Sequence, residues 1–403
     1  GPAGPASAHP ASAVASPAGR KQVSYQGYTF EVPRSWPVVR EARHLGDCVR
    51  FDEHVVYLGV PAADQSCPSR LLGTTEALLI EPGPAAASRA STENPVSREI
   101  TVTAPRISIT ATFDANPNVL YAVLASARLP APRIQPPNPA LLSAAAGKAV
   151  PVLPPKLPAR PADFRGKGFD ACTAPSSAAM TAWKEHSPYG AVGIYIGGSD
   201  RACDQANLTA AWIRRQASAG WHFFPMYVGP QAAFGELKSP ASQGMKAAAD
   251  AVVQARKLGF GPRTPLYYDM EYYPAKYTRA ALRFLSAWSA ALHRLGYLSG
   301  VYSSSSSGIV DLAREYSRHH YVMPDTIFDA LWNGSANVRD KVYRRKSWPR
   351  DHRLHQFSGN DTQKFGGFKI DLDKDYLDVS LAAPRRRPGP VRSGTAAPGR
   401  AGG

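Results

Sequence analysis

Between residues 166 and 383, short apolar runs alternate with longer segments in which apolar residues recur every three to four positions. The short runs are typical of buried strands, and the longer segments are typical of helices that cover a sheet. The expected strands are Gly168–Ala171, Val192–Ile196, His222–Val228, Pro265–Met270 and Ser299–Tyr302. The helices expected after them are Ser176–Glu185, Gln205–Ala219, Ala241–Leu258, Thr278–Leu295 and about Ile309–Arg318. The pattern therefore predicts five consecutive βα units.

Three more strand-like segments follow, with no long helical pattern between them. They are Ile327–Trp332, Leu354–Phe357 and Phe368–Leu372. Eight strands and five helices in this order correspond to (β/α)5β3. Alternation of strands and helices over this length favours a TIM-like α/β barrel of parallel strands. A doubly wound open sheet is the alternative fold.

Residues 23–129 have a different pattern, which predicts a small α+β domain. Strand-like segments alternate with turn residues, and one helical segment closes the region. The expected strands are Tyr28–Val32, Val55–Val60, Glu76–Ile80, Glu99–Thr103 and Ile107–Thr112, and the expected helix is Val119–Arg128. No nucleophile-base pair and no metal-ligand cluster is visible in this sequence region. The pattern therefore indicates a fold for this domain but no function.

Composition divides the rest of the chain. Residues 1–22 and 384–403 are rich in alanine, proline, glycine and serine or arginine, and we expect both to be disordered. Residues 130–165 form the expected linker, because ten prolines between positions 130 and 161 favour an extended, semi-rigid segment. The barrel is expected to occupy residues 166–383.

These three segments also carry most of the formal net charge of +16. The two folded regions are therefore only modestly basic. We expect the basic tails to interact with an anionic surface such as a cell wall. A nucleic-acid partner is not expected, because no recognition motif accompanies the charge.

The four cysteines fall into two local pairs, for which we predict the disulfides Cys48–Cys67 and Cys172–Cys203. Their spacing is not that of a zinc site, and four buried thiols are the alternative. Disulfides indicate an oxidising compartment, and a chain that begins at Gly1 is compatible with removal of an export signal. No apolar run is long enough to span a bilayer. We therefore expect a secreted, monomeric protein.

Acidic residues mark the ends of the expected barrel strands. Asp269 and Glu271 lie at the C-terminal end of the fourth strand, project to the same face and are about 7 Å apart along the backbone. Asp170 lies at the end of the first strand and Asp371 at the end of the last, and the first and eighth strands are neighbours in a closed barrel. Paired carboxylates at a barrel mouth are typical of sites that cleave a glycosidic bond without a cofactor. The alternatives are an ordinary acidic strand end or a site for Mg²⁺ or Ca²⁺.

Aromatic residues near the same strand ends could stack on sugar faces. They are Tyr195, Tyr227, Tyr267, Tyr302 and Trp332. For any one of them, filling the core is the competing interpretation. Gln356 on the seventh strand is a further candidate for hydrogen bonding to a ligand.

Five short motifs in this order resemble the family 25 lysozyme-type glycoside hydrolases. They are Gly168-Phe169-Asp170, Tyr268-Asp269-Met270-Glu271, Leu331-Trp332, His355-Gln356-Phe357 and Ile370-Asp371-Leu372. More closely, residues 165–381 resemble the secreted bacterial glycoside hydrolase-like family known as DUF1906, a relative of the family 25 barrel. Gly-Phe-Asp-Ala-Cys replaces the Gly-Ile-Asp-Val-Ser type of opening, and His-Gln-Phe stands where Trp-Gln-Tyr is usual.

The resemblance implies cleavage of the β-1,4 bond between N-acetylmuramic acid and N-acetylglucosamine in peptidoglycan, or action on a related polysaccharide. It implies that Glu271 is the general acid and that Asp269 stabilises the transition state or orients the N-acetyl group. Asp170 and Asp371 would hold the sugar or tune the acid. A barrel that binds glycan without cleaving it is the main rival interpretation.

Overall fold

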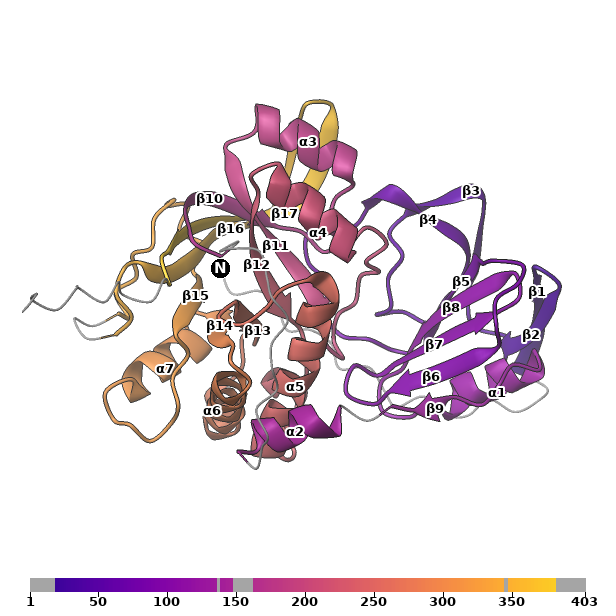
Figure 1. Cartoon of the computed structure of the whole chain (residues 1–403), viewed down its shortest axis with the longest axis horizontal. Coiled ribbons are helices and arrows are strands. Elements are labelled where there is room, and N and C mark those ends of the chain that lie inside the picture. Colours follow the sequence, from indigo (N-terminus) through magenta and orange to yellow (C-terminus); the bar gives the residue numbers. More distant parts are fainter. Residues whose placement is uncertain (1–18, 136–137, 148–161, 344–346, 382–403) are drawn as a thin grey trace, which may run out of the picture.

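A computed structural model of the protein describes residues 19–135, 138–147, 162–343 and 347–381, with the backbone alone for residues 41–45. Two domains lie side by side, a β-rich N-terminal domain and a C-terminal barrel surrounded by helices (Figure 1). Most residues of the two predicted tails fall outside the part of the chain that the structure describes. Residues 384–403 lie outside the described residues, as do residues 1–18.

The barrel consists of eight hydrogen-bonded strands that close on themselves. In order around the barrel they are β10 (Phe164–Asp170), β11 (Tyr189–Gly197), β12 (His222–Tyr227), β13 (Pro265–Asp269), β14 (Leu298–Ser304), β15 (Thr326–Ala330), β16 (His352–Phe365) and β17 (Phe368–Val379). The pairing of β10 with β17 closes the ring. The prediction of a (β/α)5β3 barrel is therefore confirmed, and the open doubly wound sheet is excluded.

The last strand departs from the predicted parallel arrangement. Strands β10 to β16 are parallel to one another, whereas β17 is antiparallel to both of its neighbours, β10 and β16. β16 and β17 form a hairpin that turns at Gly366 and Gly367, so no crossover helix is needed between them. The chain direction of β17 determines which of its acidic residues reach the barrel mouth.

Helices cover the outside of the barrel after each of the first five strands. They are α3 (Ser177–His186), α4 (Ala210–Ser218), α5 (Pro240–Leu258), α6 (Thr278–Arg294) and α7 (Gly308–Glu315), with short 3-10 turns η2 (Ala232–Phe234) and η3 (Ala275–Tyr277). Ser176 caps α3 by accepting a hydrogen bond from the Ala179 amide. Gly259 ends α5 at a φ of 93°, a left-handed conformation that glycine adopts without steric cost.

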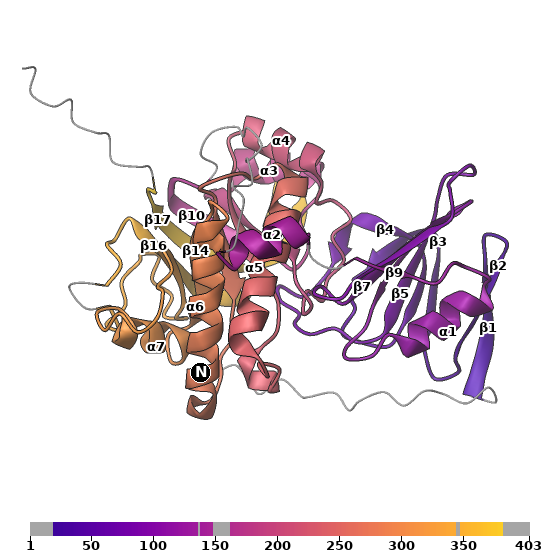
Figure 2. The ribbon, with the colours of Figure 1, turned by 60° about the horizontal axis from the view of Figure 1, so that its bottom comes forward.

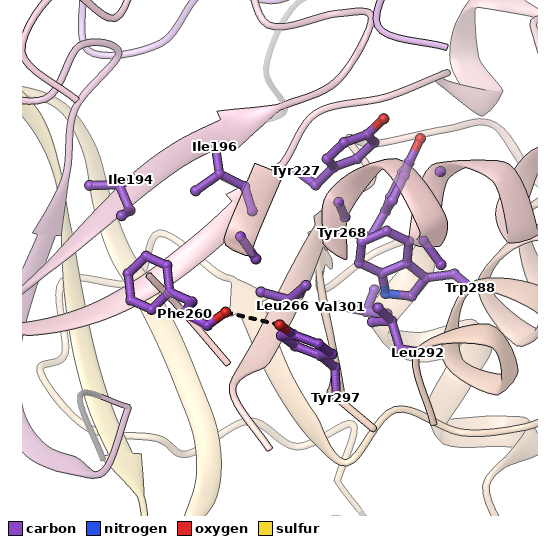
Figure 3. Packing of buried hydrophobic residues seen from close by; sticks show 14 of the residues in the cluster. Ile194, Ile196, Tyr227, Phe260, Leu266, Tyr268, Trp288, Leu292, Tyr297 and Val301 are labelled. Atoms are coloured by element: carbon purple, nitrogen blue, oxygen red, sulfur yellow. Dashed lines mark hydrogen bonds between the residues drawn. The ribbon is translucent and has the colours of Figure 1, made fainter. Parts of the chain in front are cut away.

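Side chains alternate between two cores because the strands have a period of two. Tyr268 and Val301 point outward and pack against Trp288 and Leu292 of α6 (Figure 3). Residues of the opposite parity, including Tyr267, fill the inside of the barrel. The apolar stripe that predicted α6 thus covers the sheet as expected.

The N-terminal domain contains a seven-stranded mixed sheet and a separate hairpin. The strand order is β3-β4-β5-β8-β7-β6-β9, and β1 pairs with β2. The strands are β1 (Arg20–Tyr25), β2 (Tyr28–Pro33), β3 (Val38–Asp47), β4 (Val56–Ser66), β5 (Ala77–Pro82), β6 (Ala90–Asn94), β7 (Glu99–Ala104), β8 (Ile107–Thr112) and β9 (Arg133–Ile134). Helix α1 (Asn118–Ser126) and the hairpin pack on one face of the sheet. The five predicted strands and the helix are present, and β1 shows that the ordered chain begins before residue 23.

The linker is more structured than its proline content predicts. β9 adds a short edge strand beside β6, and α2 (Pro139–Ala145) packs against α5 and α6 of the barrel (Figure 2). Leu141 and Ala145 are buried in the barrel core. The expectation of an extended linker is therefore wrong for these described parts, because apolar side chains on α2 can be buried against the barrel helices.

Both predicted disulfides are confirmed: Cys48 is bonded to Cys67, and Cys172 to Cys203. The two bonds lie against each other where the domains meet. Their presence is typical of proteins outside the reducing cytoplasm. Among the described residues, no helix combines the length and apolarity needed to cross a membrane.

Candidate active site

Carboxylates from three strands meet inside the mouth of the barrel. Asp170 ends β10, Asp269 ends β13, and Asp373 and Asp375 lie on β17. In the strand register, Asp373 is opposite Asp170. All four side chains are essentially buried. Glu271 follows β13 and remains partly accessible, with 23% of its side chain exposed.

The predicted residue Asp371 is not part of this cluster. It is paired with Thr362 on the projecting part of the β16–β17 hairpin, and its Oδ1 accepts a hydrogen bond from the Thr362 hydroxyl. β10 ends at the level of Asp373, so Asp371 lies beyond the barrel wall. The expectation that Asp371 approaches the mouth is wrong because β17 runs antiparallel. Its middle, rather than its first residues, meets the mouth end of β10.

Gln356 connects the carboxylates to the aromatic side of the site. Its Nε2 donates to Asp170 Oδ2 at 3.0 Å and to Asp373 Oδ2 at 3.3 Å. Its Oε1 accepts from the Tyr302 hydroxyl at 2.8 Å and from Trp332 Nε1 at 3.0 Å. The candidate from the seventh strand thus contacts three other predicted site residues, Asp170, Tyr302 and Trp332.

The predicted aromatic residues divide between the site and the core. Tyr195 donates to Asp170 Oδ1, while Tyr302 and Trp332 line the cavity described below. Tyr227 instead points outward, donates to Asp250 Oδ2 at 2.6 Å and packs near Trp288 (Figure 3).

Tyr267 lies deeper in the barrel, where its hydroxyl is 3.4 Å from the Thr326 hydroxyl. Tyr227 and Tyr267 are therefore core residues, and their predicted sugar contacts are wrong. Strand parity decides the first case and depth along the strand decides the second.

Gln231, which sequence analysis missed, holds the Asp269–Glu271 step. Its Oε1 accepts a hydrogen bond from the Glu271 amide at 2.8 Å. Its Nε2 donates to the carbonyl oxygens of Asp269 at 2.7 Å and Gly229 at 3.0 Å. A buried amide with both ends engaged fixes the backbone that presents the two acids. No sequence pattern marks Gln231, because its partners in the Asp269–Glu271 step are backbone groups about 40 residues away.

Burial makes this cluster retain protons. Loss of hydration raises the pKa of Asp269 well above its ordinary value, and the adjacent Glu271 charge raises it further. Burial, followed by repulsion from Asp170, raises the pKa of Asp375 well above the usual range and that of Asp373 to about 7. The pKa of Asp170 is also raised by burial, although Arg70 opposes that shift. Burial therefore shifts all four carboxyl groups toward their protonated forms.

A cation from the other domain lies among these acids. Arg70 belongs to the loop between β4 and β5 of the N-terminal domain. Its Nη1 donates to Glu271 Oε1 and to the Tyr302 hydroxyl, both at 2.5 Å. Its Nε is 3.3 Å from Asp373 Oδ2, and its Nη2 is 3.9 Å from Asp170 Oδ1. The guanidinium also lies 4.6 Å from the centre of the Tyr302 ring.

Arg70 could not be predicted as a site residue from the sequence, for a physical reason. It is about 200 residues from Glu271 in the chain, and its own domain shows no constellation of reactive residues. One arginine in a loop is normally solvated, so no local pattern distinguishes it. Only the contact between the domains brings it to the barrel.

A cavity of about 590 Å³ opens above this group. It is lined by Arg70, Glu271, Tyr272, Tyr302, Ser304, Ser305, Ser306, Ala330, Leu331, Trp332, Asn360 and Asp373. The Trp332 side is accessible, since 45% of this residue is exposed. Aromatic faces, hydroxyls and carboxylates in one cavity are suited to a polar ring-shaped ligand such as a sugar.

Cys48, Cys67 and Cys203 have the spacing of a possible metal group among the described residues. Their sulfurs belong to disulfides, so they are not thiolate ligands.

Comparison with known proteins identifies the barrel. Residues 181–377 match the family model described as "Rv2525c-like, glycoside hydrolase-like domain". The barrel is an Rv2525c-like glycoside hydrolase-like domain. The family match lies within the barrel, so the β-rich N-terminal domain is outside it.

Three solved structures are similar to about half of the chain. An uncharacterized protein of B. stearothermophilus is 20% identical, with a TM-score of 0.39, covering 53% of this chain and 95% of its own. The Mycobacterium tuberculosis Tat-secreted protein Rv2525c in complex with L-tartrate is 14% identical, with a TM-score of 0.39, covering 53% and 96%.

The catalytic domain of endolysin ply40 from bacteriophage P40 of Listeria monocytogenes is 16% identical, with a TM-score of 0.34, covering 54% and 95%. No curated protein sequence matches the chain.

Proposed function

We propose that the Rv2525c-like barrel binds and hydrolyses a cell-wall polysaccharide of the peptidoglycan type, outside the cytoplasm of a bacterium. The observation that supports it is the convergence of Asp170, Asp269, Glu271 and Asp373 beneath a cavity walled by Trp332. A buried carboxylate group next to an aromatic wall provides both the acid and the sugar platform that glycoside hydrolysis needs.

Glu271 is the proposed general acid because it lines the cavity, whereas Asp269 is buried behind it. Glu271 protonates the glycosidic oxygen, and the bond between that oxygen and the anomeric carbon breaks. Water then adds to the anomeric carbon, and the proton that this water loses returns to the Glu271 carboxylate. Asp269 keeps a proton nearby, since two adjacent carboxyl groups share protons rather than ionise together. Asp170 and Asp373 provide negative charge for the oxocarbenium-like transition state.

The second candidate function is glycan binding without cleavage. The ion pair between Arg70 and Glu271 favours it, because an ionised carboxylate held by a guanidinium has no proton to donate. The aromatic wall and the cavity would serve either function. The two candidate functions differ in whether Glu271 has a proton to donate.

Pulldown on insoluble peptidoglycan, run beside an assay for released reducing sugar, tests the proposal. The protein, an Arg70→Ala variant and the same variant carrying Glu271→Gln are compared. Binding by all three, with release that disappears on Glu271→Gln, supports hydrolysis. Binding by all three proteins with sugar release by none of them supports the second candidate. Absence of both binding and release contradicts a peptidoglycan ligand.

A matched control is Glu185→Gln. Glu185 is an exposed glutamate on α3 with 66% of its side chain accessible. The same substitution there removes one negative charge from the barrel without touching the cavity. Any loss of activity on Glu185→Gln would show that net charge, and not the site, controls the assay.

A further inference from the structure

The loop that carries Arg70, residues 67–76, is attached to the barrel along its length. Ser69 donates to Asn360 Oδ1 at 3.0 Å, next to the cavity. The Gly73 amide donates to the Asp200 carbonyl oxygen at 3.0 Å, and the Thr74 hydroxyl donates to the Ser199 carbonyl oxygen at 2.7 Å. Hydrogen bonds therefore anchor the loop to the barrel on both sides of Arg70 and hold the guanidinium in the site.

The charge of Arg70 matches the position that it occupies. A guanidinium remains protonated at any physiological pH, and burial alone would disfavour the charge. Burial acts to lower the pKa of Arg70, but the surrounding acids, Glu271 foremost, raise it well above its usual value. Two of its nitrogens, Nε and Nη2, have no hydrogen-bond partner among the described residues. The Arg70 side chain is therefore held mainly by Coulombic attraction to several acids, because only part of its hydrogen-bonding capacity is used.

Arg70 also separates the deepest acids from the cavity. Arg70 and Glu271 line the open space, whereas Asp170 and Asp269 are fully buried and do not. Asp269 makes a side-chain hydrogen bond with Glu271, which is itself paired with Arg70. Arg70 therefore lies between the deepest acids and the space that a ligand would enter.

We propose that the group of acids at the base of the cavity is a cation subsite whose resident occupant is the chain's own Arg70. By placing Arg70 there, the N-terminal domain holds the hydrolase closed. This inference rests on the proposed function. The guanidinium occupies the place where positive charge develops on the sugar during hydrolysis, and it ties up the Glu271 proton donor. Hydrolysis then requires the loop to withdraw.

The interface between the domains is suited to opening. Its contacts are largely polar: Asn94 donates to Asp250 Oδ1 at 3.0 Å, and Arg98 lies 3.4 Å from Glu236 Oε1. The main apolar cores of the two domains are separate clusters. Polar interfaces between domains permit relative motion more readily than continuous apolar cores. Two apolar contacts near Arg70 also join the domains. Leu72 packs against the inner barrel core, and Leu71 packs with the two disulfides.

The test is an Arg70→Ala variant of the full chain, with Arg34→Ala as the matched control. Arg34 is an exposed arginine of the same domain whose Nη2 donates to the Arg20 carbonyl oxygen. The initial rate of reducing-sugar release from soluble peptidoglycan fragments should rise about tenfold or more on Arg70→Ala, a typical size for coupling between sites. It should be unchanged on Arg34→Ala. A rate at or below wild type in folded Arg70→Ala protein overturns the proposal.

Methylguanidinium supplies a second readout that does not depend on hydrolysis. At low millimolar concentration it should raise the thermal midpoint of Arg70→Ala and not that of the wild type, with sodium chloride as the ionic control. It should also inhibit the variant competitively. No difference in midpoint shift between variant and wild type overturns the proposed subsite.

Failure of the two proposals can be distinguished. A selective midpoint shift without sugar release by either protein supports the subsite and contradicts hydrolysis. Release by wild type that falls on Arg70→Ala supports hydrolysis and overturns the inhibitory role. If Arg70→Ala does not fold, Arg70→Met retains the aliphatic stem without the charge and takes its place in both measurements.

Discussion

The two domains contribute opposite charges to one cavity, and they do so by different routes. The barrel supplies carboxylates from β10, β13 and β17, each placed by its position on a strand. The N-terminal domain supplies the single guanidinium of Arg70 from a loop. The acids follow from a repeating local pattern, whereas the cation depends on how two folded units meet. The acids of a site and the residue that controls their access to a ligand can therefore come from different domains.

The largest expected effect comes from removing the proposed general acid, Glu271, in a protein that already lacks Arg70. In an Arg70→Ala background, Glu271→Gln should lower the rate of sugar release by at least about 100-fold, the usual contribution of a general acid. The thermal midpoint should change little, because the variant retains the shape of the side chain. Rates and melting curves measured on the same samples check this. Retained turnover would assign the acid to another residue.

Removing the disulfide at the base of the Arg70 loop should loosen the cation's attachment. Cys48→Ser with Cys67→Ser opens a link between residues 19 positions apart, which should cost about 3 kcal/mol of stability by chain entropy. The rate of sugar release should rise as the loop is freed. Denaturant unfolding and the release assay measure the two effects.

The other disulfide is the control for this prediction. Cys172→Ser with Cys203→Ser opens a link of similar size inside the barrel. It should reduce stability without raising the rate. Intact mass of the parent protein should increase by two pairs of hydrogens on reduction. Equal effects of the two double variants on the rate would contradict a special role for the Arg70 loop.

The acids on β17 should differ in their effect on pH-dependent stability. Asp373 has a pKa raised to about 7 in the folded protein, against an ordinary value of 3.8. Between these values the folded state binds the proton more tightly than the unfolded state, so stability from this group is lost as pH rises from about 4 to 7. Asp373→Asn, whose amide does not titrate, should remove roughly 4 kcal/mol of that loss. Asp371→Asn should leave it unchanged.

Midpoints of urea unfolding at pH 4.5 and pH 8 measure this difference. The wild type and Asp371→Asn should lose the same stability over the interval, and Asp373→Asn should lose less. A flatter profile for Asp371→Asn than for Asp373→Asn would contradict the placement of these two acids.

The smallest expected effect concerns the aromatic wall. Trp332→Ala should weaken glycan binding by about 1 kcal/mol, the usual worth of one stacking contact. Trp332→Phe should retain most of the affinity but lose the hydrogen bond to Gln356 Oε1. Binding isotherms on soluble fragments check both. Equal weakening by the two variants would assign the effect to that hydrogen bond.

Much of the barrel and part of its site could be predicted because the relevant signals are local. Strand parity and order placed Asp170, Asp269 and Gln356 in the barrel interior, and Glu271 beside them. The same reasoning failed for Tyr227, which points outward to Asp250. It also chose Asp371 over Asp373, because the direction of the last strand is not visible in its composition. Errors of one or two positions in strand register move a side chain to another environment.

The sequence by itself determined the (β/α)5β3 order, the two disulfide pairs and the presence of acids at the barrel mouth, since each depends on neighbouring residues or simple periodicity. Only the tertiary structure decided that β17 runs antiparallel, that Gln231 holds the Asp269–Glu271 step and that Arg70 covers the acids. These features depend on contacts between residues far apart in the chain. Packing of complete domains selects such contacts, and no local pattern records them.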